Sequence, residues 1–138
     1  MMDPRGHMAT ARRVLASAAP KAVVWAASPR LATWIAAELV AAGVEPLQAT
    51  SFRHVDASLR YDSVPPCSLA VLDFTAISAA DIATLTTARW AGYRGAIVAV
   101  AGPGIVSPQT EAIVRIDAIV RGEGPDLRSA VARLFAPR

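Results

Sequence analysis

The chain alternates between two patterns of apolar and polar positions. Short, nearly continuous apolar runs are bounded by glycine, proline or polar residues, which is typical of strands buried on both faces of a parallel sheet. The segments between them carry apolar residues every three or four positions, as one face of a helix does. The predicted strands are 21–26, 44–50, 68–74, 95–101 and 116–120, and the predicted helices are 29–43, 51–60, 79–92, 108–114 and 125–135.

Particular residue types mark the helix boundaries. Ser28 and Ser107 each precede a proline, and a serine N-cap followed by proline at the first helical position is a strong start signal. Ser78 is the corresponding cap of the third helix. Gly43 and Gly92 follow the first and third helices, where glycine commonly ends a helix.

The alternation of strands and helices predicts an α/β fold with helices on both faces of a five-stranded parallel sheet. Right-handed crossovers are nearly obligatory in such units, so a three-layer sandwich follows, but the pattern alone leaves the strand order open. Pro46 cannot donate a ladder hydrogen bond, so we expect its strand at a sheet edge. We expect one domain over 21–138 after a flexible tail at 1–20, with a loop at 61–66.

The composition indicates a compact protein in a reducing compartment. A chain of 138 residues with 54% hydrophobic and 18% charged residues can bury a core without disulfides or metals. The single cysteine, Cys67, has no disulfide partner within the chain and no CxxC spacing for zinc, which favours a cytoplasmic location. We expect neither a metal nor a cofactor.

The charge distribution does not indicate nucleic acid or a membrane as partner. The formal charge is +3, but the arginines beyond the first 20 residues are spread along the chain without a dense run. The apolar stretch VLASAA near the start is shorter than a secretory signal requires. No segment approaches the roughly 20 uninterrupted apolar residues of a membrane span.

The candidate for chemistry is an aspartate at the end of an apolar run. Residues 69–75 read LAVLDFT, so Asp73 ends the third predicted strand. It could simply cap the segment that follows. It could also lie at the carboxyl ends of the parallel strands, where open α/β sheets place their ligands.

Five βα units with an aspartate ending the third strand resemble the receiver domain of two-component response regulators. The resemblance covers residues 21–136. It implies a (βα)5 flavodoxin-like three-layer sandwich with strand order 2-1-3-4-5. It also places Asp73 at the position of the phosphoacceptor.

The family pattern is otherwise largely replaced. The family has an acidic pair after the first strand, a threonine or serine after the fourth, and an aromatic residue and a lysine on the fifth. The positions of these groups are occupied here by Ala26 and Ala27, by Ala101, and by Ala118 and Arg121. Receivers hold Mg²⁺ against the aspartate during phosphoryl transfer, and Mg²⁺ usually takes one or two carboxylates together with water. Asp73 alone would hold it poorly.

The resemblance therefore implies a pseudo-receiver, a degenerate receiver that acts through protein contacts without phosphorylation and without enzymatic activity. The hydroxyl and the aromatic ring that transmit phosphorylation in the family are both replaced by alanine. In the family the phosphoacceptor and lysine positions converge, so we hypothesise an ion pair between Asp73 and Arg121, whose guanidinium fork suits a carboxylate.

Receivers commonly bind partners through the fourth helix, fifth strand and fifth helix, which here correspond to 108–135. We expect a homodimer, or docking to a kinase or effector, through this surface. Its charged candidates are Arg115, Asp117, Arg128 and Arg133.

Two alternatives stay open. A true phosphoacceptor domain would use Asp73 with Ser28 or Glu123 as replacement ligands. A small-anion sensor would use the Gly102-Pro103-Gly104 loop, whose amides follow the fourth strand.

Overall fold

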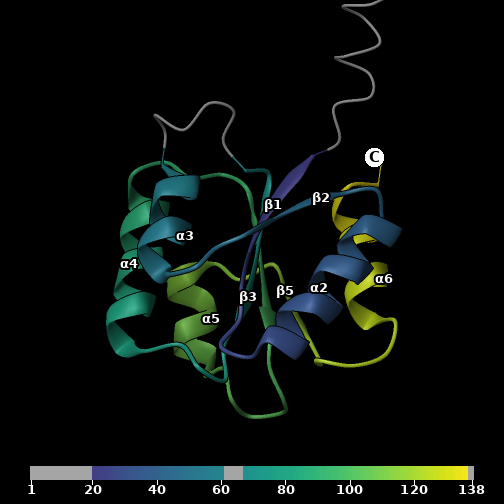
Figure 1. Ribbon diagram of the computed structural model, residues 1–138. Coiled ribbons are helices and arrows are strands. Elements are labelled where there is room, and N and C mark those ends of the chain that lie inside the picture. The colour runs from purple at the N-terminus through teal and green to yellow at the C-terminus, as the bar shows by residue number, and fades with distance from the viewer. Residues whose placement is uncertain (1–19, 61–66, 137–138) are drawn as a thin grey trace, which may run out of the picture.

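The computed structural model describes residues 20–60 and 67–136 and has a parallel sheet between two helical layers (Figure 1). The elements are β1 (Lys21–Trp25), α2 (Pro29–Ala41), β2 (Glu45–Gln48), α3 (Phe52–Leu59), β3 (Leu69–Asp73), α4 (Ala79–Trp90), β4 (Ala96–Val100), α5 (Pro108–Val114), β5 (Ala118–Val120) and α6 (Asp126–Leu134). The predicted loop at 61–66 and all but the last residue of the predicted tail at 1–20 lie outside the described residues.

The sheet has the order β2-β1-β3-β4-β5, and all four neighbouring pairs are parallel. This is the flavodoxin-like order that the resemblance implied, and the α/β prediction is confirmed. Pro46 lies on β2, which is an edge strand as predicted.

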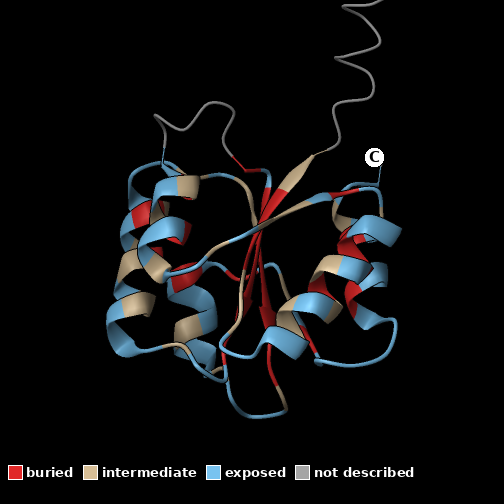
Figure 2. Cartoon of the chain, in the orientation of Figure 1, coloured by how far each residue is buried: buried red, intermediate tan, exposed pale blue. Residues whose placement is uncertain are grey.

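The core is divided by the sheet into two layers (Figure 2). On one face, α3, α4 and α5 pack against the strands, with Leu85 and Val114 fully buried. On the other face, α2 and α6 do so, with Leu39 and Leu127 fully buried. Since β3 is covered on both faces, all of its residues are buried, which explains its continuous apolar run.

Serine side chains begin four of the helices. Each accepts a hydrogen bond from the backbone N–H three residues on, which satisfies one of the free donors of the first turn. The four caps are Ser28, Ser51, Ser78 and Ser107. Gly43 and Gly92 follow α2 and α4 with φ of 82° and 106°, a left-handed conformation that favours glycine. The predicted start and stop signals are confirmed.

The fifth strand is shorter than the predicted range of 116–120. Arg115, the residue that follows α5, has a left-handed backbone conformation with φ of 60°, and β5 begins three residues later. The Asp117 carboxylate, not a backbone carbonyl, accepts the Ile97 N–H at 2.8 Å. The Asp117 N–H in turn donates to the Ile97 carbonyl at 2.8 Å, so the backbone and the side chain of Asp117 together begin the pairing of β4 with β5.

Arg89 joins α4, α5 and the starts of β4 and β5. Its side chain is only 8% exposed. Its five hydrogen bonds match the five donors of a guanidinium. They run to the carbonyl oxygens of Val114 (2.8 Å), Tyr93 (3.1 Å), Gly95 (2.7 Å) and Arg115 (2.8 Å), and to Asp117 Oδ2 (3.2 Å). The carbonyls left unpaired at the end of α5 are therefore satisfied by an α4 side chain.

Tyr93 packs against the backbone beside Arg89. Its hydroxyl donates to the Cys67 carbonyl at 3.0 Å, which connects the turn after α4 to the start of β3. A Cβ added at Gly95 would lie 2.1 Å from the Tyr93 hydroxyl oxygen and 2.9 Å from the Ser68 carbonyl oxygen. Only glycine fits at position 95 without displacing the ring.

We expect Arg89→Lys to lower the free energy of unfolding by about 2 to 4 kcal/mol, because an ammonium group cannot reach all the acceptors that the guanidinium binds. Urea denaturation measures the loss. The exposed Arg133 on α6 offers the matched control, and Arg133→Lys should leave the midpoint unchanged. Equal midpoints for the two variants would contradict the role assigned to Arg89.

We expect Gly95→Ala to destabilise the protein by about 1 to 3 kcal/mol, because the added methyl group overlaps Tyr93 and the Ser68 carbonyl. Thermal unfolding followed by circular dichroism measures the effect. Gly102→Ala is the control, since a Cβ there meets nothing within 4 Å. A melting temperature unchanged by Gly95→Ala would show that the ring can move aside freely.

Candidate functional site at the carboxyl edge of the sheet

The candidate site residues meet at the carboxyl ends of the central strands. The sheet register places Trp25 opposite Leu72 and Asp73 opposite Val100, so the segments that follow β1, β3 and β4 leave the sheet together. The segment after β1 begins with Ala26 and Ala27, and the segment after β4 begins with Ala101. The structure therefore brings Ala26, Ala27 and Ala101 to the same edge of the sheet as Asp73.

The Asp73 carboxylate is buried, with 2% of the residue exposed. Its Oδ2 accepts the Ala27 N–H at 3.3 Å, and its Oδ1 accepts the Thr75 N–H at 3.0 Å together with the Thr75 hydroxyl. The carboxylate thus connects the turn after β1 to the turn after β3. Both oxygens have partners within the chain, and neither faces open solvent.

The groups around Asp73 offer little to a metal ion. Alanine has no side-chain oxygen, and Ala101 is itself buried. Within residues 20–60 and 67–136, no three His, Cys, Asp or Glu residues are grouped so as to hold a metal. Mg²⁺ prefers several oxygen ligands in near-octahedral geometry. The described residues do not supply that set of ligands.

The two proposed replacement ligands lie in a neighbouring hollow. Ser28 and Glu123 line it together with Trp34 and Gly122, but Asp73 does not. The Ser28 hydroxyl accepts the Leu31 N–H at 3.3 Å and so acts as the cap of α2.

Arg121 does not pair with Asp73, so the hypothesised ion pair is wrong. The ion pairs among the described residues are Arg60–Asp56, Arg89–Asp117 and Arg128–Glu38. Arg121 is exposed and lines a different hollow. The carboxylate is buried and bonded by Ala27 and Thr75, so it does not depend on a cation for its partners.

The expected interaction residues lie on both sides of the edge strand β5. Arg115 follows α5, on the face of the sheet covered by α4, whereas Arg128 and Arg133 belong to α6 on the opposite face. Asp117 is bound by Arg89 and by the Ile97 N–H, which gives it a structural role. Arg128 reaches Glu38 of α2 at 2.7 Å and so holds the two helices of its layer together.

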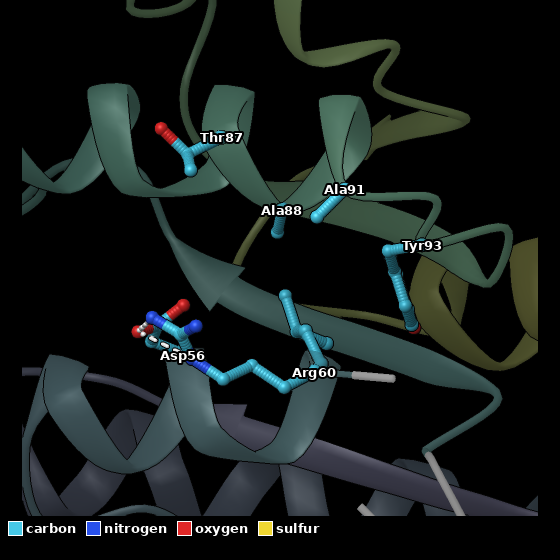
Figure 3. Close-up of a pocket in the computed structure, with 7 residues that line it drawn as sticks. Asp56, Arg60, Thr87, Ala88, Ala91 and Tyr93 are labelled. Carbon is cyan, nitrogen blue, oxygen red and sulfur yellow. Dashed lines mark hydrogen bonds and ion pairs between the residues drawn. The ribbon is translucent and has the colours of Figure 1, made fainter. Parts of the chain in front are cut away.

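A further hollow lies at the opposite edge of the sheet, between α3 and α4 (Figure 3). Leu59, Ala88 and Tyr93 give it apolar walls, and the Asp56–Arg60 ion pair at 2.7 Å lies at its rim.

Burial raises the pKa of Tyr93, so the phenol stays protonated and keeps its hydrogen bond to Cys67. Burial likewise raises the pKa of the Cys67 thiol, which makes it a poor nucleophile.

Sequence reasoning missed Arg89, Glu38 and Trp90. Arg89 shares a helix face with Leu85, and an arginine in a buried register is the signal that it has several acceptors. Glu38 is a buried acidic residue that directly precedes the core residue Leu39 in the sequence. Trp90 is the opposite case, an aromatic residue that is 86% exposed.

Comparison with known proteins adds a structural likeness. No protein-family model and no curated protein matches the chain. A receiver domain of a response regulator from Clostridium thermocellum superposes with a TM-score of 0.65 at 16% identity, over 84% of this chain and 94% of that one.

Two further similar structures are a candidate pilus assembly protein and a candidate pilus assembly-related protein. The one from Burkholderia thailandensis (cpaE) has a TM-score of 0.66 at 17% identity, over 86% of this chain and 99% of that one. The one from Burkholderia pseudomallei has a TM-score of 0.65 at 17% identity, over 88% and 96%. The chain has a receiver-type fold. In its described part, no helix is long and apolar enough to cross a membrane.

We expect Asp73→Ala to destabilise the fold by about 1 to 3 kcal/mol, because it leaves the Ala27 and Thr75 amides without their acceptor. Chemical denaturation measures the change. Exposed Asp126 on α6 gives the control, and Asp126→Ala should have a much smaller effect. If Asp73→Ala leaves the stability unchanged or raises it, the carboxylate is kept for function and not for structure.

Proposed function

We propose that the protein is a pseudo-receiver, a signalling module of receiver fold that acts through protein contacts without phosphorylation. The observation that carries this proposal is the burial of Asp73 with both carboxylate oxygens bound inside the chain. A phosphoacceptor needs an oxygen open to the incoming phosphoryl group and a metal to neutralise its charge. Asp73 as it lies here offers no such oxygen.

The residues around Asp73 support the same proposal. Alanine at 26 and 27 offers no metal ligand, and alanine at 101 offers no hydroxyl to bind a phosphoryl group. Ala118 is partly buried against the α2 and α6 layer, and its methyl group is too small to act as a rotating aromatic switch. Arg121 faces solvent instead of the carboxylate. Together these replacements remove both the reaction and its usual transmission.

The proposed partner is another protein, and the proposed location is the cytoplasm. Receiver-type domains dock kinases, effectors or second copies of themselves. Two of the similar structures are a candidate pilus assembly protein and a candidate pilus assembly-related protein, so a protein assembly is an equally suitable setting for such a module. The lone buried thiol of Cys67 suits a reducing compartment.

A small-anion sensor is the second candidate, because one feature of the structure favours it. The Gly102-Pro103-Gly104 loop and Arg121 line the same hollow, of about 250 Å³. Asp126 lines it as well, and its carboxylate would repel an anion bound beside Arg121. This opposing charge is the reason we place the sensor second.

Tryptophan fluorescence tests the proposal, because Trp25 directly precedes Ala26 and packs edge-on against Phe52 at 5.4 Å between ring centroids. We expect no saturable change on titration with Mg²⁺ and then beryllofluoride, a phosphoryl mimic, because no open carboxylate oxygen is available. A saturable response that requires Mg²⁺ and is lost in Asp73→Asn would overturn the proposal.

The same titration with inorganic phosphate separates the sensor from the pseudo-receiver. A response to phosphate that is lost in Arg121→Ala would favour the sensor. A functional receiver domain run in parallel confirms that the beryllofluoride is active.

A further inference from the structure

Two large apolar side chains are exposed beside one hollow on the α4–α5 face. Trp90, the last residue of α4, is 86% exposed, and Ile113 on α5 is 55% exposed. Both line a hollow of about 450 Å³, together with Arg89, Ala112 and Arg115. The hollow therefore lies between the ends of two helices that are neighbours in the layer shown at the left of Figure 1.

Exposure of this kind needs an explanation. Single apolar residues are common on protein surfaces, but a tryptophan exposes a large hydrophobic ring that folding usually covers. Here a second apolar side chain from another helix borders the same hollow. Apolar side chains gathered on one surface mark contact sites, and tryptophan and arginine are the residues most enriched at their energetic centres.

The surface is also held in one shape before any partner arrives. Arg89 binds the carbonyls of Val114 and Arg115, so the end of α4 that carries Trp90 is fixed to the end of α5 that carries Ile113. Its guanidinium is buried and all five of its donors are used. A surface that is already ordered loses less conformational entropy on binding.

The charged side chains that line the hollow are two arginines, Arg89 and Arg115. Arg115 is exposed and takes part in no ion pair within the described residues. The carbonyls at the end of α5, which would otherwise give a negative potential, are bound by Arg89. Glu111 is the single exposed carboxylate of α5.

We propose that Trp90, Ile113 and Arg115 form a docking surface for an amphipathic segment of a partner protein that carries apolar anchors and acidic residues. The apolar anchors would cover Trp90 and Ile113, and an acidic residue would meet Arg115. This inference rests on the proposed function and specifies its partner. The proposed surface includes α5, which is part of the expected 108–135 surface, together with the end of α4. It does not include α6.

A second copy of the chain fits this surface less well. In a two-fold dimer each residue near the axis faces its own counterpart, so Arg115 would face Arg115. Like charges so placed repel each other. An acidic partner segment avoids that repulsion and places a carboxylate beside Arg115.

The test uses three synthetic helical peptides with the same leucine and phenylalanine positions and with glutamate, glutamine or lysine at the polar positions. The full chain, labelled with ¹⁵N, is titrated with each peptide and followed by NMR. We expect the glutamate peptide to shift the Trp90 indole N–H and the Ile113 and Arg115 amides, and to bind at least about tenfold more tightly than the lysine peptide.

Single variants assign the site. Trp90→Ala and Arg115→Glu should each weaken binding of the glutamate peptide by about tenfold or more. Val40 on α2 is 63% exposed on the opposite helical layer, so Val40→Ala is the matched control and should bind as the wild type does. Unfolding midpoints equal to that of the wild type show that the variants are folded.

Three results would overturn the inference. The first is equal affinity for the glutamate and lysine peptides, and the second is an NMR signal of Trp90 that no peptide shifts. The third is a dimer in sedimentation velocity that Trp90→Ala abolishes. The last result would assign the surface to a second copy. Each leaves the Mg²⁺ and beryllofluoride result untouched, because Asp73 lies at the opposite edge of the sheet.

Discussion

The buried guanidinium of Arg89 fixes the geometry of the half of the molecule formed by α4, α5, β4 and β5. Its five bonds close the end of α5, hold the turn after α4 and meet the carboxylate that begins the β5 ladder. The segments that connect parallel strands are long, and the buried backbone N–H and C=O groups at both ends of such a segment need hydrogen-bond partners. One side chain does this for two crossovers, which is why α5 can be short and can end in a left-handed residue.

Asp73 plays the same kind of role at the other edge of the sheet. A carboxylate at the end of a central strand is suited to chemistry when its oxygens are open to ligand, and to architecture when they are bound by neighbouring turns. Here the Ala27 and Thr75 amides bind it, and the residue is almost completely buried. The bonds that the carboxylate makes to these two turns therefore give Asp73 a structural role.

The fold could be predicted from the sequence because its signals are local. Continuous apolar runs, serine caps and glycine stops lie within a few residues of the features they determine, and Pro46 marked the edge strand. The strand order came from the resemblance and not from periodicity. The side-chain pairings could not be predicted, since Glu38 and Arg128 lie 90 positions apart and no local pattern connects them. The ion pair expected between Asp73 and Arg121 failed for the same reason, because alignment gives positions and not side-chain directions.

The hydrogen bonds of Asp73 also bear on what acidic substitutions beside it would do. Replacing Ala26 and Ala27 by acidic residues would not by itself create a metal site, because the Asp73 carboxylate would still be held by the amides of Ala27 and Thr75. New carboxylates beside it would first add repulsion between like charges. A metal site at this edge of the sheet would therefore require a change in the two turns that bind Asp73 as well as new carboxylates.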